Sequence, residues 1–360
     1  CEIGLTATQN AANPYVAYLQ EGCPARVAVR FTGVSGDAAS RELTVAAFWD
    51  GGTTWKARFA PPAPGGWVFE SHSEDPGLNG VTGKLTCTAW TENEKKANPT
   101  RRGFVRVHAN EPRAGRYFEY ADGTPFLWIG DTWWNWTQRG IHFQTFKNLV
   151  DDRAKKGFNV GQLFFAANGW GRRSSLLDAG YNEPDIEWIQ SIEQCIAYAN
   201  EQGITVWIHP WWSREKLDET AGPEKMRRWW RYVIHRLAAY NVIWTLAGEY
   251  NMDNYGGLGL DFWKGLGTLV AAEDPFHHIL GVHPTPPAWS GGAEAPQWST
   301  AEVLHDQPWL DYNQSQTAHA RWRNEYAPTV VAQAYAMNPP KPIVITEPWY
   351  EFSLDAPAAK

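Results

Sequence analysis

Two stretches of the sequence, Asn241-Val-Ile-Trp-Thr-Leu-Ala-Gly-Glu249 and Pro342-Ile-Val-Ile-Thr-Glu347, each contain an apolar run that ends in a glutamate. Runs of this length and composition are typical of buried β-strands. Each strand would present a carboxylate at its carboxyl-terminal end, which is where a (β/α)₈ barrel places its functional side chains. We therefore expect Glu249 and Glu347 to belong to one site, although each could instead pair with an arginine at the end of its strand.

Strand–helix alternation surrounds these two runs and extends over residues 109–360. Repeated units of this kind predict parallel strands, and seven in series favour a closed (β/α)₈ barrel over an open sheet. No glycine-rich phosphate-binding motif follows the first strand, which argues against a dinucleotide-binding fold. No eighth strand is recognisable, so we expect the biological chain to continue or the missing strand to lie elsewhere. The expected strands are 126–131, 159–166, 204–209, 241–248, 278–283, 310–316 and 342–346, and the expected helices are 142–156, 185–201, 223–240, 260–272 and 320–337.

Residues 1–108 have a different pattern. Short alternating runs at 26–32, 42–48 and 83–89 are separated by segments rich in glycine and proline. Many short strands with frequent turns predict a β-sandwich, and no helical period of useful length interrupts them. We therefore expect an N-terminal β-sandwich domain before the barrel.

Composition narrows the classes of partner. The 360 residues carry a formal net charge of −7 and contain no basic run, which argues against nucleic acid and anionic membranes as partners. The 22 tryptophans stand out, because flat indole faces fit the apolar faces of sugar rings and the indole N–H donates to hydroxyls. Trp133-Trp134 and Trp211-Trp212 follow predicted strands and are candidates for a sugar site, whereas Trp229-Trp230 falls in a predicted helix and is expected to pack.

The four cysteines are Cys1, Cys23, Cys87 and Cys195, and they lack the spacing of a metal site. Cys195 is expected to be a small buried apolar residue of a helix. Cys23 and Cys87 fall in the same β-rich region and could form a disulfide. Cys1 could carry the lipid anchor of a bacterial lipoprotein or could mark a fragment boundary. We expect an extracytoplasmic protein, whether secreted, periplasmic or anchored at the surface.

The carboxyl-terminal ends of parallel strands meet at one edge, so the side chains there should form one site. Cleavage of a glycosidic bond needs one protonated carboxyl group and one ionised carboxylate. We assign Glu249 as general acid/base and Glu347 as nucleophile, with no metal or other cofactor. Asp131 could bind hydroxyls or orient a neighbouring side chain. The other expected substrate-binding residues are Trp133, Trp134, Asn168, His209, Trp211, Trp212, Tyr250, Asn251, His283, Gln314, Gln316, His319, Trp349 and Tyr350.

Several segments resemble a known family. Asp122-Gly-Thr-Pro-Phe-Leu-Trp-Ile-Gly-Asp-Thr-Trp-Trp134 closely resembles the opening of the apiosidase-like glycoside hydrolase domain, a bacterial (β/α)₈ family. The stretches 48–61 and 64–67 resemble the DUF5060-type β-sandwich domain that commonly precedes it. Gly248-Glu-Tyr-Asn251 and Ile345-Thr-Glu-Pro-Trp-Tyr350 fit the same family.

The resemblance implies a retaining glycosidase with its acid/base after the fourth barrel strand and its nucleophile after the seventh, the places of Glu249 and Glu347. One departure concerns Gly248, since many members of the wider superfamily carry there an asparagine that holds the sugar 2-hydroxyl. The family name points to apiose, a branched furanose of plant cell walls. We expect hydrolysis of plant or microbial polysaccharide. The alternatives are a catalytically silent carbohydrate-binding protein and a transglycosylase or lyase that uses the same two glutamates.

Overall fold

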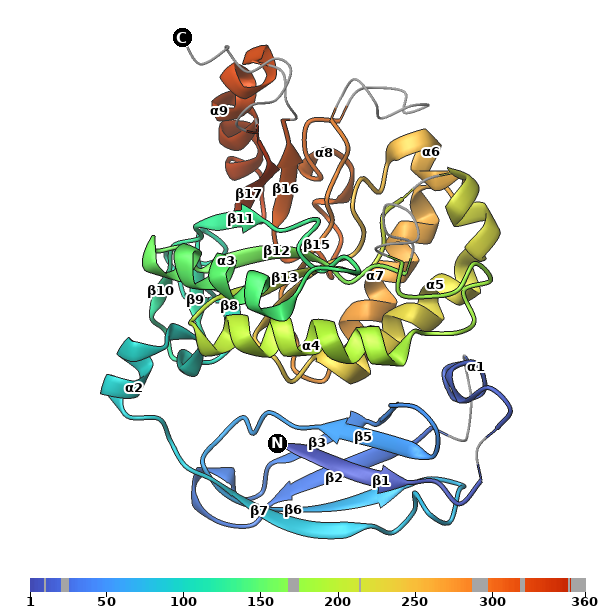
Figure 1. The fold of residues 1–360 in the computed structure, drawn as a ribbon. Helices are drawn as coiled ribbons and strands as arrows, with labels where there is room; N and C mark the ends of the chain where they lie inside the picture. Colours follow the sequence, from blue (N-terminus) through green and yellow to red (C-terminus); the bar gives the residue numbers. More distant parts are fainter. Residues whose placement is uncertain are drawn as a thin grey trace.

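The computed structural model describes residues 1–9, 11–20, 26–167, 175–213, 215–286, 297–317, 321–348 and 350. Figure 1 shows antiparallel sheets formed by the N-terminal residues below, and helices with parallel strands above. The expected α/β fold with a parallel sheet is confirmed, and the N-terminal antiparallel sheets fit a separate domain.

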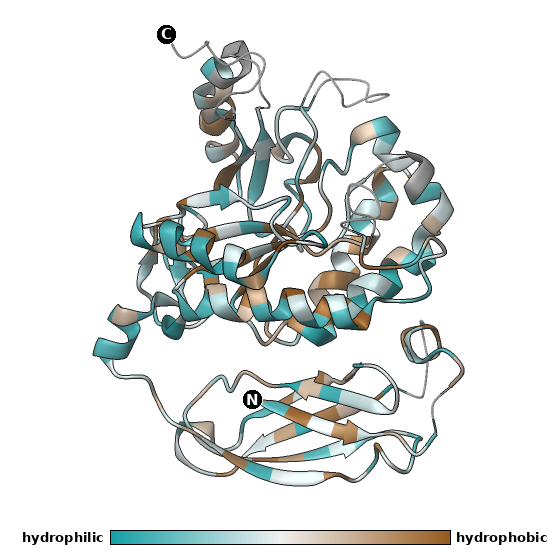
Figure 2. Cartoon of the chain, in the orientation of Figure 1, coloured by the Kyte–Doolittle hydropathy of each residue, from teal (hydrophilic) through white to brown (hydrophobic). Residues whose placement is uncertain are grey.

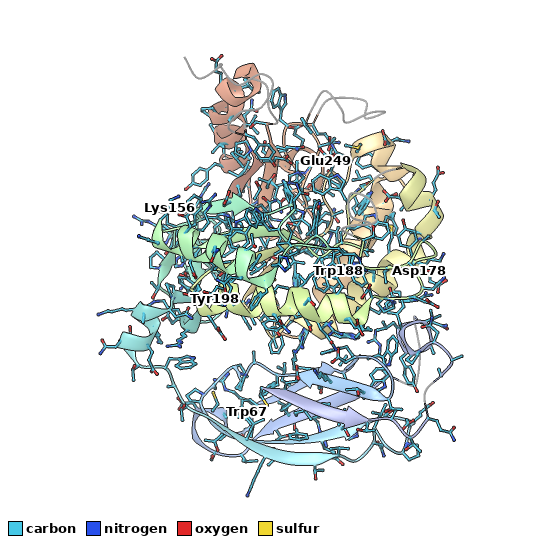
Figure 3. The ribbon with its side chains drawn as sticks, in the orientation of Figure 1. Trp67, Lys156, Asp178, Trp188, Tyr198 and Glu249 are labelled. Atoms are coloured by element: carbon cyan, nitrogen blue, oxygen red, sulfur yellow. The ribbon has the colours of Figure 1, made fainter. Side chains whose placement is uncertain are left out.

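Two antiparallel sheets make up the N-terminal part. Along β2, Val29 and Phe31 are buried while Arg30 is exposed, because successive side chains of a strand point to opposite faces. Phe31 stacks on Phe59 with ring centroids 3.8 Å apart, and Trp67, labelled in Figure 3, meets Phe59 edge-on. The strand orders are β3 (Glu42–Ala46), β2 (Ala28–Gly33), β6 (Gly65–His72), β7 (Thr82–Cys87) in one sheet and β1 (Glu2–Thr6), β5 (Thr54–Arg58), β4 (Phe48–Trp49) in the other.

Short helical segments also occur among residues 1–108, although the sequence predicts none. The side chain of Asn13 caps α1 by accepting from the Val16 N–H, and Thr91 and Glu94 form a capping box at the start of α2. Segments this short carry no readable hydrophobic period, so capping residues are their only signal. Their bounds are α1 (Pro14–Tyr18), η1 (Gly36–Ala38), α2 (Glu92–Ala97) and η2 (Pro99–Arg102).

Seven parallel strands in the described part of the chain carry the site, five in one sheet and two in another. Within each of these two sheets, strands that follow one another in the chain pair side by side. From residue 159 onward each strand lies within its predicted range or one residue beyond it. The strands are β11 (Gly130–Thr132), β12 (Val160–Phe164), β13 (Thr205–His209), β14 (Val242–Thr245) and β15 (Leu280–Gly281), then β16 (Asn313–Gln316) and β17 (Ile343–Glu347).

Helices cover the strands on their outer side. Helix α4 begins at Asp185, whose carboxylate accepts from the Trp188 N–H at 3.0 Å, and it buries a stripe that includes Ile189 and Ile196. Figure 2 shows hydrophilic residues gathered on the outer surfaces of the helices. None of the described helices is both long and apolar enough to cross a membrane. The helices are α3 (Phe143–Lys155), α4 (Ile186–Glu201), α5 (Glu215–Leu237), α6 (Met252–Gly256), α7 (Leu260–Glu273), α8 (Ala301–Leu304) and α9 (Arg321–Tyr335).

The first predicted barrel strand, 126–131, is divided in the structure. Its start belongs to an antiparallel sheet, and only Gly130–Thr132 joins the parallel one. Asn159 holds the break, because its side chain donates to the Leu127 carbonyl at 2.7 Å and accepts from the Ile129 N–H at 2.8 Å. The antiparallel sheet has the order β10 (Pro125–Phe126), β9 (Phe118–Tyr120), β8 (Val105–Val107), and its aromatic residues pack against Trp207 and Tyr312 of the parallel strands.

A buried group of charged side chains joins the N-terminal sheets to helices α4 and α5. Arg58 and Arg236 both bind Glu193, and Arg236 also lies 2.5 Å from Asp50. All four side chains are less than one-tenth exposed. Buried charges are costly unless each has a partner, so this contact fixes the two parts of the chain against each other.

Three of the four cysteines have free thiols, and they are Cys1, Cys87 and Cys195. Cys195 is buried in α4, as expected, and burial raises the pKa of its thiol to about 12. Cys23, the partner considered for Cys87, lies outside the described residues.

Candidate active site

The carboxyl-terminal ends of the parallel strands form one edge, here called the carboxyl edge. Gln162 of β12 and His209 at the end of β13 lie on the same face, with side-chain nitrogens 2.8 Å apart. Glu249 and Glu347 lie further along this face and are 8% and 5% exposed. Figure 3 labels Glu249 on the side of the parallel strands that faces away from the N-terminal sheets.

Glu249 follows β14 and has a left-handed backbone conformation, with φ of 48°. In the described part of the chain its carboxylate accepts hydrogen bonds from Trp212 Nε1 at 3.1 Å and from Gln316 Nε2 at 3.3 Å. Burial raises the pKa of this carboxyl group, and the negative charge of Glu347 raises it further. A carboxyl group with a raised pKa is suited to hold the proton that a general acid donates.

Glu347 is the last residue of β17, and a β-bulge sets its direction. Gln314 pairs with Val344 but Gln316 pairs with Glu347, so one extra residue is inserted on β17. Without the insertion, alternation would place Thr346 rather than Glu347 beside Gln316. The bulge therefore turns the Glu347 carboxylate onto the face that carries Glu249.

Among the described residues, Gln316, Tyr350 and His283 lie against the Glu347 carboxylate. Gln316 Nε2 donates to Oε2 at 2.6 Å and the Tyr350 hydroxyl donates to Oε1 at 2.6 Å. The His283 Nε2 atom lies 3.2 Å from Oε2. Hydrogen bonds donated to a carboxylate favour its ionised form over the neutral acid.

Gln316 donates to both glutamates through one nitrogen. Because Nε2 is 3.3 Å from a Glu249 oxygen and 2.6 Å from a Glu347 oxygen, those two oxygens are less than about 6 Å apart. Two carboxyl groups at this separation can act on opposite sides of a single bond.

In each of the doublets Trp133-Trp134 and Trp211-Trp212, the second ring lies at the carboxyl edge and the first packs elsewhere in the core. Trp134 and Trp212 belong to a small aromatic cluster with Phe164 and Tyr350 at the carboxyl edge. The Trp134 indole donates to the Tyr350 hydroxyl at 2.6 Å, so one indole reaches Glu249 directly and the other reaches Glu347 through Tyr350.

The first tryptophan of each doublet packs in the main hydrophobic core. Trp133 is fully buried against Phe146 of α3, and Trp211 donates to Asp218 at 2.6 Å. Neither ring belongs to the aromatic cluster, so the structure places Trp133 and Trp211 in the packing around the site and not in the cluster itself. Asp131 is paired with Arg153 and accepts from the Trp133 indole at 3.2 Å, which matches the orienting role considered for it.

His209 and His283 are fully buried beside the aromatic cluster, with ring centroids 5.6 Å apart. Burial lowers the pKa of His209 well below its ordinary value, and the neighbouring His283 lowers it further. The Nδ1 atom of each ring has no hydrogen-bond partner among the described residues, and the same holds for Gln316 Oε1. Buried polar atoms are seldom left unpaired, so a ligand rich in hydroxyl groups would find donors and acceptors here.

Tyr250, Asn251 and Gln314, which the sequence predicted to bind substrate, make hydrogen bonds to neighbouring residues beside the site. Tyr250 and Asn251 both donate to Gln297 Oε1 at 3.2 Å, and Asn251 also accepts from the Thr285 N–H. Gln314 donates to Tyr312 at 3.0 Å, one layer below Gln316. Asn168, His319 and Trp349 lie outside the described residues.

Sequence reasoning did not select Gln162 or Phe164. Phe164 packs against both Trp134 and Trp212, with ring centroids 4.9 and 5.1 Å away. The sequence could have indicated both residues. Gln162 is a polar residue within the apolar run of the predicted strand 159–166, and Phe164, two positions later, falls on the same face of that strand.

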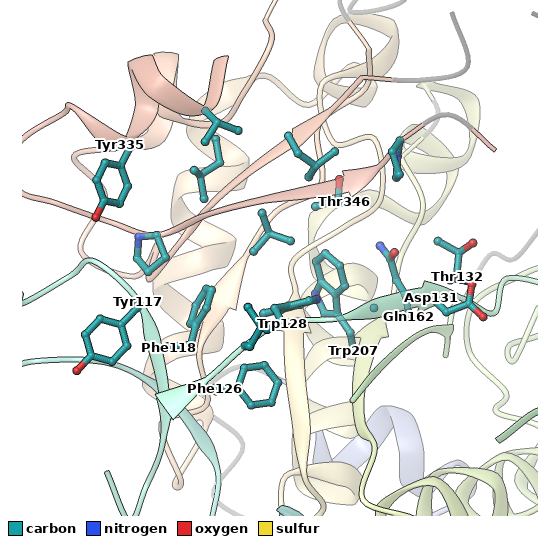
Figure 4. A pocket seen from close by; sticks show the side chains of 18 of the residues that line it. Tyr117, Phe118, Phe126, Trp128, Asp131, Thr132, Gln162, Trp207, Tyr335 and Thr346 are labelled. Carbon is teal, nitrogen blue, oxygen red and sulfur yellow. Dashed lines mark hydrogen bonds between the residues drawn. The ribbon is translucent and has the colours of Figure 1, made fainter. Parts of the chain in front are cut away.

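A groove of about 610 Å³ opens between β11 and β17, on the amino-terminal side of the aromatic cluster. Figure 4 shows Phe118, Phe126 and Trp128 on one wall and Thr346 on the other. In the described part of the chain, β11 pairs only with β12 and β17 pairs only with β16. Each of these strands therefore presents an unpaired edge to the groove.

Among the described residues, no group of three or more His, Cys, Asp or Glu side chains is placed to hold a metal ion.

Comparison with known proteins gives two family matches. Residues 112–359 match the family described as "Apiosidase-like, catalytic domain", and residues 1–74 match "Domain of unknown function (DUF5060)". Comparison with curated protein sequences gives no match.

Solved structures share the fold. A candidate glycoside hydrolase from Bacteroides vulgatus has a TM-score of 0.66 at 20% identity, covering 95% of this chain and 62% of the other. A glycoside hydrolase of family 5 from the same organism has a TM-score of 0.58 at 22% identity, covering 71% and 55%. The endo-1,4-beta-mannanase of Rhizomucor miehei has a TM-score of 0.51 at 14% identity, covering 68% and 82%. This chain thus spans less than two thirds of the two Bacteroides proteins.

Proposed function

Because the chain belongs to the family of apiosidase-like catalytic domains, we propose that it is a retaining glycoside hydrolase with Glu249 as acid/base and Glu347 as nucleophile. The proposed substrate is a plant or microbial polysaccharide or an oligosaccharide derived from it. We further propose that the protein acts outside the cytoplasm.

The main support for this proposal is that Gln316 donates hydrogen bonds to both glutamates. Gln316 holds a Glu249 oxygen and a Glu347 oxygen less than about 6 Å apart. Retaining enzymes keep their carboxyl groups about 5–5.5 Å apart so that one can attack the sugar directly, whereas inverting enzymes need about 6.5–9.5 Å for an intervening water. The geometry therefore favours direct attack.

The surroundings of the two carboxylates support the division of roles. Glu347 has short hydrogen bonds from Gln316 and Tyr350, which favour the charged form that a nucleophile needs. Glu249 has longer hydrogen bonds, and burial raises its pKa. In the proposed reaction Glu249 protonates the leaving oxygen while Glu347 attacks the anomeric carbon. Glu249 then takes a proton from the water that releases the sugar.

We propose that the parallel strands belong to a closed (β/α)₈ barrel over residues 109–360, preceded by a sandwich domain over 1–108. The groove between the unpaired edges of β11 and β17 supports this, since a strand placed there would pair with both. Apolar residues such as Phe118 and Val344 line that space, so the apolar side chains of a strand placed there would be buried.

The test is hydrolysis of a panel of plant and bacterial polysaccharides and aryl glycosides by the wild type, Glu249→Gln and Glu347→Gln. Glu187→Gln is the control, because Glu187 is exposed on α4. We expect the wild type and the control to release one sugar, and both site variants to lose at least about 10³-fold in kcat. Proton NMR of the first product then reports the anomer, and an inverted anomer would contradict the nucleophile assignment.

The same panel addresses the alternatives. Wild-type protein that binds oligosaccharide but leaves every linkage intact would support a carbohydrate-binding protein built on an enzyme scaffold. Longer products in acceptor-rich solution would indicate a transglycosylase, and unsaturated products would indicate a lyase.

A further inference from the structure

Gly248, the residue before Glu249, lies directly against the Trp212 ring. A Cβ atom built on Gly248 would overlap the Cε3, Cζ3 and Cδ2 atoms of that ring. The indole thus occupies the space that any other side chain at position 248 would need. A larger residue at 248 would have to displace the ring.

The backbone fixes this arrangement on both sides. The Gly248 N–H donates to the Trp211 carbonyl at 2.8 Å, and the Ser213 N–H donates to the Gly248 carbonyl at 2.9 Å. These bonds form a parallel bridge between Trp212 and Gly248. Because the ring is also packed between Phe164 and His283, its indole N–H has a defined direction.

That direction leads to the Glu249 carboxylate, 3.1 Å from Trp212 Nε1. We propose that Trp212 is a positioning residue for Glu249, and that Gly248 is the residue that admits its ring. This inference rests on the acid/base role proposed for Glu249. It identifies Trp212 as the group that orients the Glu249 carboxyl group and contributes to its electrostatic environment.

The chemistry follows from the indole group, which only donates hydrogen bonds. A donor 3.1 Å from Oε2 stabilises the ionised carboxylate more than the neutral acid. Trp212 therefore opposes the effect of burial, so that Glu249 can release its proton in one half of the reaction and take one up in the other. The same bond limits rotation of the carboxyl group.

The first test needs no substrate. Proton–nitrogen correlation spectra record the indole N–H signals across a pH series, and the signal lost in Trp212→Phe identifies Trp212. We expect this signal to shift with a midpoint above the ordinary glutamate pKa of 4.5. The shift should disappear in Glu249→Gln. In Glu347→Gln the midpoint should fall, because a neighbouring negative charge is removed.

If Trp212→Phe does not fold, the indole signal that stops titrating in Glu249→Gln gives the same assignment. A Trp212 signal that does not titrate, or that titrates unchanged in Glu249→Gln, would overturn the proposal. Titration of this signal in a protein without hydrolytic activity would leave the positioning contact intact and count against the proposed function alone.

The second test uses the pH dependence of kcat/KM. Trp212→Phe keeps a ring but loses the donor, so we expect a loss of about 10-fold and an alkaline limb that moves to higher pH. Trp230→Phe is the control, because its indole donates to the Leu246 carbonyl on the helix side of the strand. An alkaline limb that moves equally in both variants, or in neither, would contradict a specific role for Trp212.

Discussion

Glu249 and Glu347 are joined through one side chain, since both accept a hydrogen bond from the Gln316 amide nitrogen. The bonds measure 3.3 Å to Glu249 and 2.6 Å to Glu347, so the amide is held more closely by the carboxylate proposed as nucleophile. A neutral donor between two carboxyl groups reduces their repulsion when both are ionised and keeps both on one face of the sheet.

Replacing Gln316 by leucine should remove this bridge while keeping a side chain of similar size. Hydrogen bonds to charged groups contribute about 1.5–3 kcal/mol, so kcat/KM should fall about 10–100-fold. The pKa of Glu249 should rise, because the Gln316 hydrogen bond lowers it, and the alkaline limb of the pH profile should move up. Gln144→Leu, on the exposed start of α3, is the control. Equal kcat/KM values in the two variants would contradict the bridging role.

A stability measurement can test the burial of Glu249 without any substrate. The folded-state pKa of Glu249 is raised, so the folded protein binds this proton more tightly than the unfolded chain. The resulting stabilisation is complete below the unfolded pKa and is lost as the pH rises through the folded pKa. Glu249→Gln mimics the protonated form, so it should be more stable than wild type at neutral pH.

We expect the gain to be about 0.5–2 kcal/mol in the free energy of unfolding, the usual range when an active-site compromise is removed. It should shrink toward zero below the ordinary pKa of 4.5. Urea denaturation at several pH values measures it, with Glu187→Gln as the exposed control. A gain that grows as the pH falls would have the wrong sign and would contradict a raised pKa.

The contact between Gly248 and Trp212 predicts opposite effects for two glycine substitutions. Gly248→Ala should destabilise the fold by about 1–3 kcal/mol, because the new methyl group overlaps the indole. Gly265→Ala should instead stabilise it by about 0.5–1 kcal/mol, since nothing lies within 4 Å of that position and it is inside helix α7. Thermal and urea denaturation compare the two, and a Gly248→Ala protein as stable as wild type would contradict the observed packing.

The parallel strands β12, β13, β14 and β17 could be predicted because each lies in a largely apolar run of the length expected for a buried strand, whereas β16 is the polar run Asn-Gln-Ser-Gln. The same runs identified where Glu249 and Glu347 leave the sheet. Which face Glu347 occupies could not be read, because the bulge near Thr346 reverses the alternation and nothing in Ile-Val-Ile-Thr-Glu marks an inserted residue.

The tryptophan doublets show a second limit of the sequence. Adjacent residues of an extended chain point to opposite sides, so one ring of each doublet had to face away from the site. The choice between Trp211 and Trp212 depends on the backbone bridge to Gly248, which is a tertiary contact. The left-handed turn from Asp253 to Tyr255 could not be predicted from the sequence either, since non-glycine residues rarely adopt that conformation.

Buried charges on Arg58, Arg236 and Glu193 join the N-terminal sheets to the helices. Glu193→Gln removes the carboxylate that Arg58 and Arg236 share, and leaves Asp50 as a counter-charge for Arg236. Breaking a buried ion pair in this way typically costs about 3–5 kcal/mol. We therefore expect a large loss in the free energy of unfolding.

The matched control is Glu70→Gln, because Glu70 pairs with Arg30 on the surface where both side chains are nearly half exposed. Exposed pairs contribute about 0–1 kcal/mol, so this variant should unfold close to wild type. Urea denaturation followed by tryptophan fluorescence compares the two. If Glu193→Gln were as stable as Glu70→Gln, the N-terminal sheets would be held to the helices mainly by apolar packing, and the charged group would contribute alignment rather than stability.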